Sequence, residues 1–575
     1  MIRKILSLVS APLLLAGCAA DPVAPVSTPS AASQTAFERG MVSAADPRAA
    51  EAGAAMLRKG GSATDAAIAT MLALTVVEPQ SSGIGGGGFY VRSDTSGAVE
   101  TIDGRETAPA GATPDWFLGP DGKPLEFGDA VRSGLSIGVP GNIALAAEAH
   151  RRHGKLAWSE LFQPAIGLAR DGWTVSERFR EFLSRRPDTA ARDAAGQALF
   201  YGDGDQPLPV GTTVRNPALA RTLETIAADG ADSFYKGATA SAMAVKVRAD
   251  TPRDGGMTAA DVAEYKARSR EPVCGPYRAY TVCSMGPPSS GATTVLAILG
   301  QLQRFDMAAL GKDSPEAWHL FAESQRLAYA DRERYLADSD FVTVPVKGLV
   351  APAYLASRAA LINPARSMAS AEPGTPDGVA MAPPDGDEPV ENGTSHFAVI
   401  DKAGNAVSYT STVESAFGSG LMFGGFYLNN ELTDFSRSPE KDGIPVVNRV
   451  EGGKRPRSSM SPTVVFGPDG KLVLAVGAAG GTTIPVQVSR AIIGFIDWQL
   501  PIGQALALPV LFAPGDFVIV EQGTWLEEMV PALEALGHAK VMARGLPTKT
   551  NAIAVVNGKL VGAADPRSEG KAVSE

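Results

Sequence analysis

The segment that most constrains this chain is a long stretch without periodicity that runs directly into two strand-like segments. Residues 365–393 are rich in Pro, Gly, Ala and acidic residues, a composition typical of an exposed loop. Residues 394–400 and 406–413 are rich in β-branched and aromatic residues and flank a turn at 401–405, which predicts a β-hairpin. A loop that leads straight into a buried hairpin is what a chain-cleavage site requires.

Helix and strand signals alternate along the rest of the chain, which has 575 residues, 45% of them hydrophobic, enough for a large core. Residues 48–59 predict a helix ended by a Gly-Gly pair, and residues 63–76 predict a second helix capped by Ser62 or Thr64. A further helix is predicted from Ser314-Pro315 to about residue 338. We find no internal repeat.

The composition argues against several partners. There are 52 Lys and Arg residues and 62 Asp and Glu residues, a net charge of −10, and no long basic run, so nucleic acid is not an expected partner. The histidines show no metal-ligand spacing with Cys or carboxylates, so we expect them to be structural and expect no metal site. They are His150, His153, His319, His396 and His538.

The N-terminus has the pattern of an export signal. Arg3 and Lys4 precede a short apolar run that is too short to span a bilayer. Leu15-Ala16-Gly17-Cys18 resembles a bacterial lipobox, so we expect residues 1–17 to be a lipoprotein signal peptide and Cys18 to be lipidated. The alternative is an ordinary signal peptide with an incidental cysteine.

The residues after the lipobox indicate a location. Ala19, by resemblance to sorted lipoproteins, favours the outer membrane, which predicts a periplasmic, lipid-anchored protein. Residues 18–35 are rich in Pro, Ser and Ala and predict a flexible tether. Since no later segment has about 18 consecutive apolar residues, we expect a soluble body that meets the membrane through its lipid anchor only.

Two cysteines remain in the expected mature chain, Cys274 and Cys283. Disulfides persist in exported proteins, and Gly275-Pro276 as a turn would let the two cysteines face each other on a hairpin. Two buried free thiols are the alternative, because spacing alone does not fix the geometry.

Two motifs suggest other enzymes, but their contexts are wrong. Residues 134–138 match the hydrolase nucleophile elbow with Ser136, yet Val139-Pro140-Gly141 delays the helix that an elbow requires. Residues 83–88 contain the dinucleotide-binding glycine pattern, but they follow a helix and precede a strand.

A larger set of motifs resembles the γ-glutamyltransferase family, in the family's order across nearly the whole mature chain. In the C-terminal part they are Gly393-Thr394-Ser395-His396, Phe417-Gly418-Ser419-Gly420, Leu428 to Phe435, Lys454 to Pro462 and Gly480-Gly481. Upstream they are Gly60 to Ala67, Glu78 to Gly88, Arg105-Glu106-Thr107-Ala108-Pro109, Gly138-Val139-Pro140-Gly141 and Pro287 to Gly291.

The resemblance implies an α+β fold, the four-layer αββα sandwich of the N-terminal-nucleophile hydrolases. It also implies self-cleavage between Gly393 and Thr394. Residues 36–393 would form a large subunit and 394–575 a small catalytic subunit, associated as a heterodimer within one domain.

The chemistry of such a cleavage can be argued from the residues. A threonine hydroxyl is a weak nucleophile, but a threonine at a new N-terminus carries its own base, the α-amine. That amine has an ordinary pKa of about 7.7–8.0, so a useful fraction is neutral near pH 7. Gly393 can adopt the strained backbone that the cleavage needs. By resemblance, Thr412 hydrogen-bonds the nucleophile and the Gly480 and Gly481 amides form an oxyanion hole.

The expected substrate is glutathione or another γ-glutamyl compound, whose donor end carries an α-carboxylate and an α-ammonium. Arg105 can bind that carboxylate bidentately, assisted by the hydroxyls of Ser458 and Ser459. The ammonium would be held by the acidic positions Glu414, Glu431 and Asp434. The γ-glutamyl group would pass from Thr394 to water or to an amino acid or peptide, without a cofactor.

Two alternatives remain open. One is a cephalosporin (glutaryl) acylase of the same superfamily, and the other is a catalytically dead lipoprotein that binds γ-glutamyl peptides. The stretch 437–453, where the family often has a lid with an aromatic residue over the donor, contains no Tyr or Trp. How a lid would gate this site is therefore open, as is the balance between hydrolysis and transfer.

Overall fold

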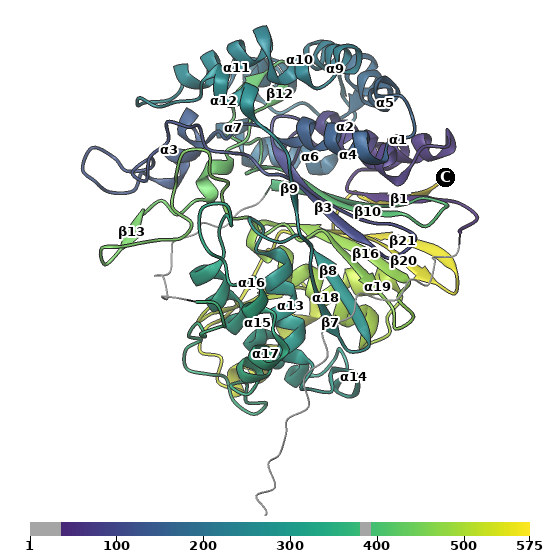
Figure 1. Cartoon of the computed structure of the whole chain (residues 1–575), viewed down its shortest axis with the longest axis vertical. Coiled ribbons are helices and arrows are strands. Elements are labelled where there is room, and N and C mark those ends of the chain that lie inside the picture. The colour runs from purple at the N-terminus through teal and green to yellow at the C-terminus, as the bar shows by residue number, and fades with distance from the viewer. Residues whose placement is uncertain (1–35, 380–392) are drawn as a thin grey trace, which may run out of the picture.

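Two antiparallel β-sheets lie face to face in the middle of the molecule, with helices on both outer faces (Figure 1). The computed structural model describes residues 36–379 and 393–575. The expected signal peptide, Cys18, the tether at 18–35 and residues 380–392 of the expected loop lie outside the described residues. The arrangement confirms the expected αββα sandwich.

The first sheet has seven strands, and its chain order is interleaved. In spatial order they are β22 (Lys571–Ser574), β1 (Met41–Ala44), β9 (Gly393–Ile400), β10 (Ala406–Glu414), β2 (Gly87–Ser93), β3 (Val99–Gly104) and β6 (Arg268–Arg270). Strands from both sides of the Gly393-Thr394 junction therefore hydrogen-bond to one another within one sheet.

The second sheet has six strands, and those that come after the Gly393-Thr394 junction in the chain lie together on one side of it. In spatial order they are β21 (Lys559–Ala564), β20 (Lys549–Val556), β16 (Leu472–Ala479), β15 (Thr463–Phe466), β8 (Tyr280–Ser284) and β7 (Val273–Tyr277). Ser408 of β10 donates to the carbonyl oxygen of Val476 on β16 at 3.1 Å, a direct link between the sheets.

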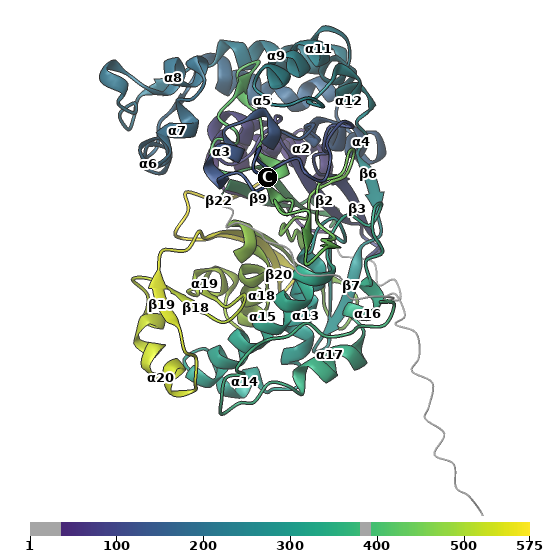
Figure 2. The same ribbon diagram turned by 90° about the vertical axis from the view of Figure 1, so that its left-hand side faces the viewer.

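Helices cover the outer face of each sheet (Figures 1 and 2). Those on the side of the first sheet include α1 (Pro47–Arg58), α2 (Ala63–Val77), α4 (Asn142–His153), α5 (Trp158–Asp171), α6 (Glu177–Arg185), α9 (Pro217–Asp229) and α11 (Gly237–Ala249). Those on the side of the second include α13 (Gly291–Leu302), α15 (Pro315–Tyr335), α17 (Pro352–Ala359), α18 (Ile484–Ile496) and α19 (Ile502–Ala507). Each helical layer shares a large hydrophobic core with its sheet.

Smaller elements complete the fold. A three-stranded sheet is formed by β17 (Leu511–Phe512), β18 (Val518–Glu521) and β19 (Val541–Arg544), beside α20 (Val530–Ala535). Within residues 36–379 and 393–575, no helix is both long and apolar enough to cross a membrane.

The local predictions near the first sheet are confirmed. The hairpin predicted at 394–400 and 406–413 is β9 and β10, with paired residues from Ala406 and Ile400 onward. The helix predicted at 63–76 is α2, and its cap is Ser62, whose side chain and Asp65 form a capping box. The helix predicted to reach residue 338 ends at Tyr335.

The loop prediction is confirmed for its described part, with a difference in exposure. Residues 365–379 contain no helix or strand. They are not simply exposed, because the Met368 N–H donates to Glu323 at 2.7 Å and the Gly374 N–H donates to Asp331 at 2.7 Å. Backbone contacts with α15 thus hold this part of the loop against the second helical layer.

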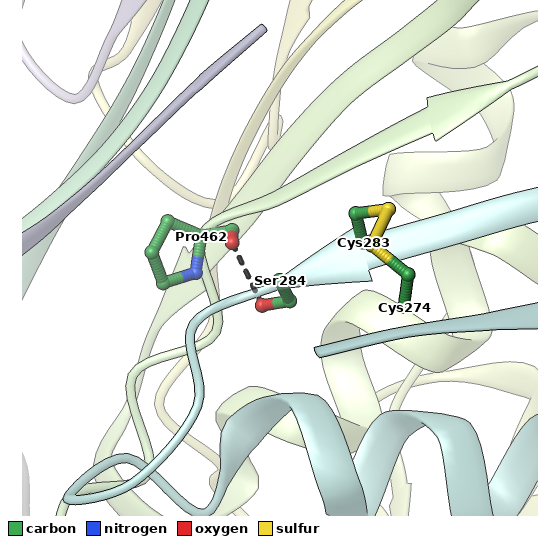
Figure 3. Close-up of a disulfide and its surroundings, with 4 residues drawn as sticks. All are labelled: Cys274, Cys283, Ser284 and Pro462. Atoms are coloured by element: carbon green, nitrogen blue, oxygen red, sulfur yellow. Dashed lines mark hydrogen bonds between the residues drawn. A yellow bond between two sulfur atoms is a disulfide. The ribbon is translucent and has the colours of Figure 1, made fainter. Parts of the chain in front are cut away.

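Cys274 and Cys283 form a disulfide between directly opposed residues of β7 and β8 (Figure 3). The turn, however, was predicted in the wrong place. Gly275 and Pro276 lie within β7, and the hairpin turns after Tyr277, where Arg278 has a φ of 54°. Pro276 is tolerated there because β7 is an edge strand, which can spare a backbone N–H donor.

Candidate active site

The junction between Gly393 and Thr394 lies at the start of the buried strand β9. The register with β10 shifts between Ser411 and Glu414, so that Gly393 pairs with Glu414. This irregularity brings the Thr412 hydroxyl oxygen to 3.2 Å from that of Thr394 and to 2.7 Å from the Gly393 carbonyl oxygen. The Glu414 N–H donates to the Thr412 oxygen at 2.8 Å, which leaves the Thr412 proton for the carbonyl.

The Thr394 side chain is next to the peptide bond that precedes it. Its hydroxyl oxygen lies 2.5 Å from the Gly393 carbonyl oxygen, and the residue is 5% exposed. A polarised carbonyl, a neighbouring hydroxyl and exclusion of bulk water are what attack on that carbonyl requires.

Gly393 has no room for a side chain. A Cβ there would lie 2.8 Å from the carbonyl carbon and oxygen of Ser415, and closer still to the carbonyl oxygen of Glu414. The close approach of two backbone segments thus explains the glycine, whereas its left-handed freedom is not needed.

Gly480 and Gly481 follow β16 at the end of the second sheet that faces Thr394. The His396 ring packs on Gly477 of β16, and Lys549, which pairs with Ala479, contacts Ser395. The two strands therefore run in opposite directions across the sandwich, and the glycines come at the Thr394 end. Gly480 and Gly481 have φ values of 135° and 56°, and their N–H groups open a 3₁₀ turn, where such groups lack intrahelical partners.

The expected donor-binding residues also lie together. Glu431 and Asp434 stand on a 3₁₀ turn, Glu431–Asp434, and both form ion pairs with Arg105. All three side chains are 1% exposed. The sequence predicted that Arg105 would face a substrate carboxylate and that the two acids would face an ammonium. In the structure the guanidinium of Arg105 pairs with both acids, and their roles toward a substrate stay a prediction.

This buried cluster, which we call the acidic pocket, has more carboxylates than cations. Glu106 and Glu414 join Glu431 and Asp434 beside Arg105, and both are buried. Within the described chain, both oxygens of Glu106, one of Glu414 and one of Glu431 accept no hydrogen bond. Burial raises the pKa of Glu106 to about 7 and, with the nearby Asp434, that of Glu414 to about 8. Such a pocket favours a ligand that brings a positive charge.

Of the two expected serines, Ser458 lies beside Arg105 and Ser459 contacts Arg332. Arg105 donates from Nη2 to the Arg457 carbonyl oxygen at 2.8 Å, which places the next residue, Ser458, beside the guanidinium. The hydroxyl oxygen of Ser459 accepts from Arg332 Nη2 at 2.7 Å. An oxygen that accepts from a guanidinium keeps its own proton for another acceptor, such as a carboxylate.

Three comparisons agree on the relationship of this chain. The gamma-glutamyltranspeptidase family model matches residues 49–574. The chain belongs to the gamma-glutamyltranspeptidase family. It is 38% identical over 548 residues to the glutathione hydrolase proenzyme of Escherichia coli strain K12, a match that covers 92% of this chain and 91% of that protein.

Acylases are also similar to this member of the gamma-glutamyltranspeptidase family. The acylase ACY 1 proenzyme of Pseudomonas sp. strain V22 is 34% identical, over 93% of each chain. The crystal structure of the cephalosporin acylase from Bacillus halodurans superposes with a TM-score of 0.80 at 26% identity and covers 97% of this chain and 99% of that one.

The motifs that suggested other enzymes lie in contexts that do not fit those enzymes. The hydroxyl of buried Ser136 donates to the carbonyl oxygens of Val131 and Ser133, and α4 begins only at Asn142. The glycines at 83–88 come after α2 and lead into β2, as expected.

The histidines were expected to show no ligand grouping, but the fold brings two of them to one carboxylate. His319 Nδ1 lies 2.8 Å from His538 Nε2, and Glu323 lies one helical turn after His319 on α15. Since His538 comes from a distant loop, sequence spacing does not reveal this group. Glu323 already accepts from Arg326 at 2.8 Å, so hydrogen bonds account for it as it stands.

Several site residues were not predicted from the sequence. Asn430 donates to Glu414 and Thr433 and so fixes the acidic side of the pocket. Arg455 and Arg457 could have formed a surface cluster, but both are buried, and Arg455 pairs with Asp103 at 2.6 Å. The only signal for these residues was their place within or beside motifs that were already recognised.

The stretch 437–453 forms a small exposed hairpin of β13 (Glu440–Lys441) and β14 (Ile444–Pro445). Asn448 anchors its base, since its amide donates to the Asp434 carbonyl oxygen at 2.7 Å. This hairpin is thus anchored beside Asp434, and β13 projects outward from the sandwich (Figure 1).

Proposed function

We propose that this protein is a self-processing γ-glutamyltransferase and glutathione hydrolase. The observation that carries the proposal is the pairing of Thr394, next to Thr412 and the Gly393 carbonyl, with a buried acidic pocket around Arg105. The similarity to a glutathione hydrolase proenzyme over 92% of the chain supports it.

The first reaction is cleavage of the chain. The Thr394 oxygen attacks the Gly393 carbonyl carbon and gives up its proton, and Thr412 stabilises the oxyanion by its hydrogen bond. The C–N bond breaks, the Thr394 nitrogen takes a proton, and an ester joins Gly393 to the Thr394 oxygen. Water hydrolyses that ester, leaving a carboxylate on Gly393 and a free amine on Thr394.

Turnover uses the new amine. It accepts the proton of the Thr394 hydroxyl as the oxygen attacks the γ-carbonyl of the donor. The Gly480 and Gly481 N–H groups are offered to the developing oxyanion. Collapse releases the donor's amine, and water or an acceptor amine then takes the γ-glutamyl group. In the uncut chain the nitrogen is an amide and cannot act as this base.

The charges of the pocket favour γ-glutamyl over glutaryl donors. The γ-glutamyl group has an α-ammonium that can replace Arg105 opposite Glu431 and Asp434, while its carboxylate takes the guanidinium. A glutaryl group has no ammonium, so it would leave buried carboxylates without a counter-charge, which makes discrimination large. This favours the transferase over the acylase, despite the structural similarity to an acylase.

A matched pair of anilides tests the proposal. Purified protein should show two bands, the smaller beginning Thr-Ser-His, and should hydrolyse a γ-glutamyl anilide with a kcat/KM at least about 100-fold above that for the glutaryl anilide. Asp434→Asn should reduce the difference in kcat/KM between the two anilides. Addition of glycylglycine as an acceptor should reveal transfer of the γ-glutamyl group. Equal values for the two anilides would indicate the acylase, whereas a single uncut band without activity would indicate a binding protein.

We also propose that the enzyme is a lipoprotein of the periplasm, held at the outer membrane by Cys18. The support is the Leu15-Ala16-Gly17-Cys18 sequence and the tether composition that comes after it. The wild-type protein should fractionate with outer membranes and have the mass of a lipid on Cys18, and Cys18→Ala should remain unlipidated. Wild-type protein that is wholly soluble with a different mature start would contradict this location.

A further inference from the structure

A buried ion pair joins the two predicted fragments directly behind the nucleophile. Glu78 follows α2 in the large fragment, and Lys549 begins β20 in the small fragment. Their charged atoms lie 2.9 Å apart, and the side chains are 4% and 3% exposed. The Thr394 hydroxyl itself donates to Gly393 and Thr412, so the pair lies outside its immediate contacts.

Both charges meet on Ser395, the residue after the nucleophile. The Ser395 hydroxyl donates to Glu78 Oε2 at 2.6 Å and accepts from Lys549 Nζ at 3.2 Å. Lys549 also donates to Ser81 at 3.3 Å, on the segment whose carbonyl accepts the Val413 N–H. The pair therefore fixes the main chain on both sides of the Thr394–Thr412 contact.

Stability alone does not account for such a pair. Burying two charges costs several kcal/mol per ion, and a well-packed apolar pair is often as stable or more so. Burial lowers the pKa of Lys549, while the nearby Glu78 opposes this change. A function next to the nucleophile explains why charges are kept where apolar side chains would fit.

We propose that Glu78 and Lys549 are positioning residues that hold the Thr394 amine in place after cleavage and balance the electric potential around it. This inference rests on the proposed function, because that function makes the amine the catalytic base. The amine begins the residue that Ser395 follows, so both charges lie close to it. A positive charge disfavours the ammonium form and a negative charge favours it, and the intact pair keeps the two effects nearly balanced.

Other charged groups face the same region and are the same in every variant of the test. Asp46 and Arg48 lie at the start of α1, Arg178 lies on α6, and each acts electrostatically on Lys549 or Glu78. Glu414 pairs with Gly393 across the hairpin. Differences among variants of the pair therefore report the pair itself.

The test compares the acidic limb of kcat/KM against pH for a γ-glutamyl anilide, to which the Thr394 amine contributes, while Glu414 beside it is the same in each variant. Lys549→Met leaves Glu78 alone and should move this limb to higher pH by about half to one unit. Glu78→Gln leaves Lys549 alone and should move it to lower pH by a similar amount. Cleavage should change less than turnover, because the nitrogen is still an amide during cleavage.

The double variant Glu78→Gln/Lys549→Met guards against misfolding, because it leaves no buried unpaired charge. This variant should cleave itself and should restore the wild-type position of the acidic limb of the pH profile. Its kcat should fall about tenfold or more at an unchanged KM. Lys549→Arg keeps the cation and should retain the wild-type limb.

Wild-type kcat in the double variant, or single variants that turn over with an unmoved limb, would overturn the inference. Wild-type protein without γ-glutamyl activity would instead refute the proposed function.

Discussion

At the scale of single residues, Gly393 and Glu106 show how backbone packing and burial each prepare the site. Gly393 is crowded by the main chain of β10, so its carbonyl is held against two hydroxyls. Glu106 is buried beside Glu431, and burial raises its pKa to about 7. The first feature favours cleavage and the second favours binding of a cation.

Replacing Gly393 with Ala should slow cleavage at least about tenfold, because the new Cβ would push the carbonyl away from Thr394 and Thr412. The rate of band conversion on a gel measures this. Gly515→Ala is the matched control, since a Cβ at Gly515 meets nothing within 4 Å. Thr394→Ala should remain uncut, and Thr394→Ser should retain some cleavage. Unchanged conversion in Gly393→Ala would show that the crowding is unimportant.

Replacing Glu106 with Gln should stabilise the unoccupied protein at alkaline but not at acidic pH. Burial raises the pKa of Glu106 to about 7, so the folded state holds a proton that the unfolded state has lost above an ordinary value of about 4.5. The protonated side chain thus contributes fully to folding stability below the ordinary pKa, and this contribution is lost as pH rises through the folded-state pKa of about 7. Glutamine cannot ionise and escapes the loss, which amounts to about 3 kcal/mol at most.

Thermal unfolding at pH 5 and pH 8 measures this difference. The Tm advantage of Glu106→Gln over wild type should be larger at pH 8. Glu534→Gln, the same change at an exposed position, is the matched control. An advantage that is equal at both pH values would contradict the assigned ionisation.

At the scale of elements, the parts that local sequence determines were predictable and the long-range ones were not. The hairpin β9–β10, the Ser62 cap and the wrong context of Ser136 could be inferred from neighbours in sequence. The turn at Arg278 was missed because Gly-Pro normally signals a turn, and only the edge position of β7 permits a proline within the strand. The Glu78–Lys549 pair spans 471 residues of sequence, so no local pattern reveals it.

The disulfide between β7 and β8 gives a prediction at this scale. Cys274→Ser/Cys283→Ser should weaken the hairpin locally by roughly 2–3 kcal/mol at most, as expected for a short closed loop. Faster hydrogen exchange of β7 amides should show this, while kcat/KM is preserved because β7 is the edge strand of the second sheet, whereas β9 lies in the first sheet. Treatment of wild type with a reductant should reproduce the effect, because Cys274 is exposed. Loss of activity would show instead that the disulfide is needed to maintain the active site.

At the scale of the whole molecule, the interleaved first sheet makes the two predicted fragments inseparable without unfolding. β9 and β10 of the small fragment lie between β1 and β2 of the large one, and in the second sheet β15 of the small fragment pairs with β8 of the large one. Cleavage at Gly393-Thr394 therefore changes the chain count but not the sheet pairing. Refolding from separated fragments becomes bimolecular, whereas refolding of the uncut chain is unimolecular.

The uncut Thr394→Ala variant should accordingly regain its structure from urea at a rate that does not depend on protein concentration. The processed enzyme should regain less structure as it is diluted. Circular dichroism during refolding at three concentrations compares the two. Equal, concentration-independent recovery would mean that the fragments fold independently and dock afterwards.

The edge strands of both sheets affect how readily the protein aggregates. An exposed strand edge is a template on which another chain can add and start aggregation. The edge strands β22, β6 and β21 carry the exposed cations Lys571, Arg268 and Lys559, and β7 carries the exposed Pro276. The charged side chains and the missing backbone N–H of Pro276 thus disfavour edge-to-edge pairing of the sheets between molecules.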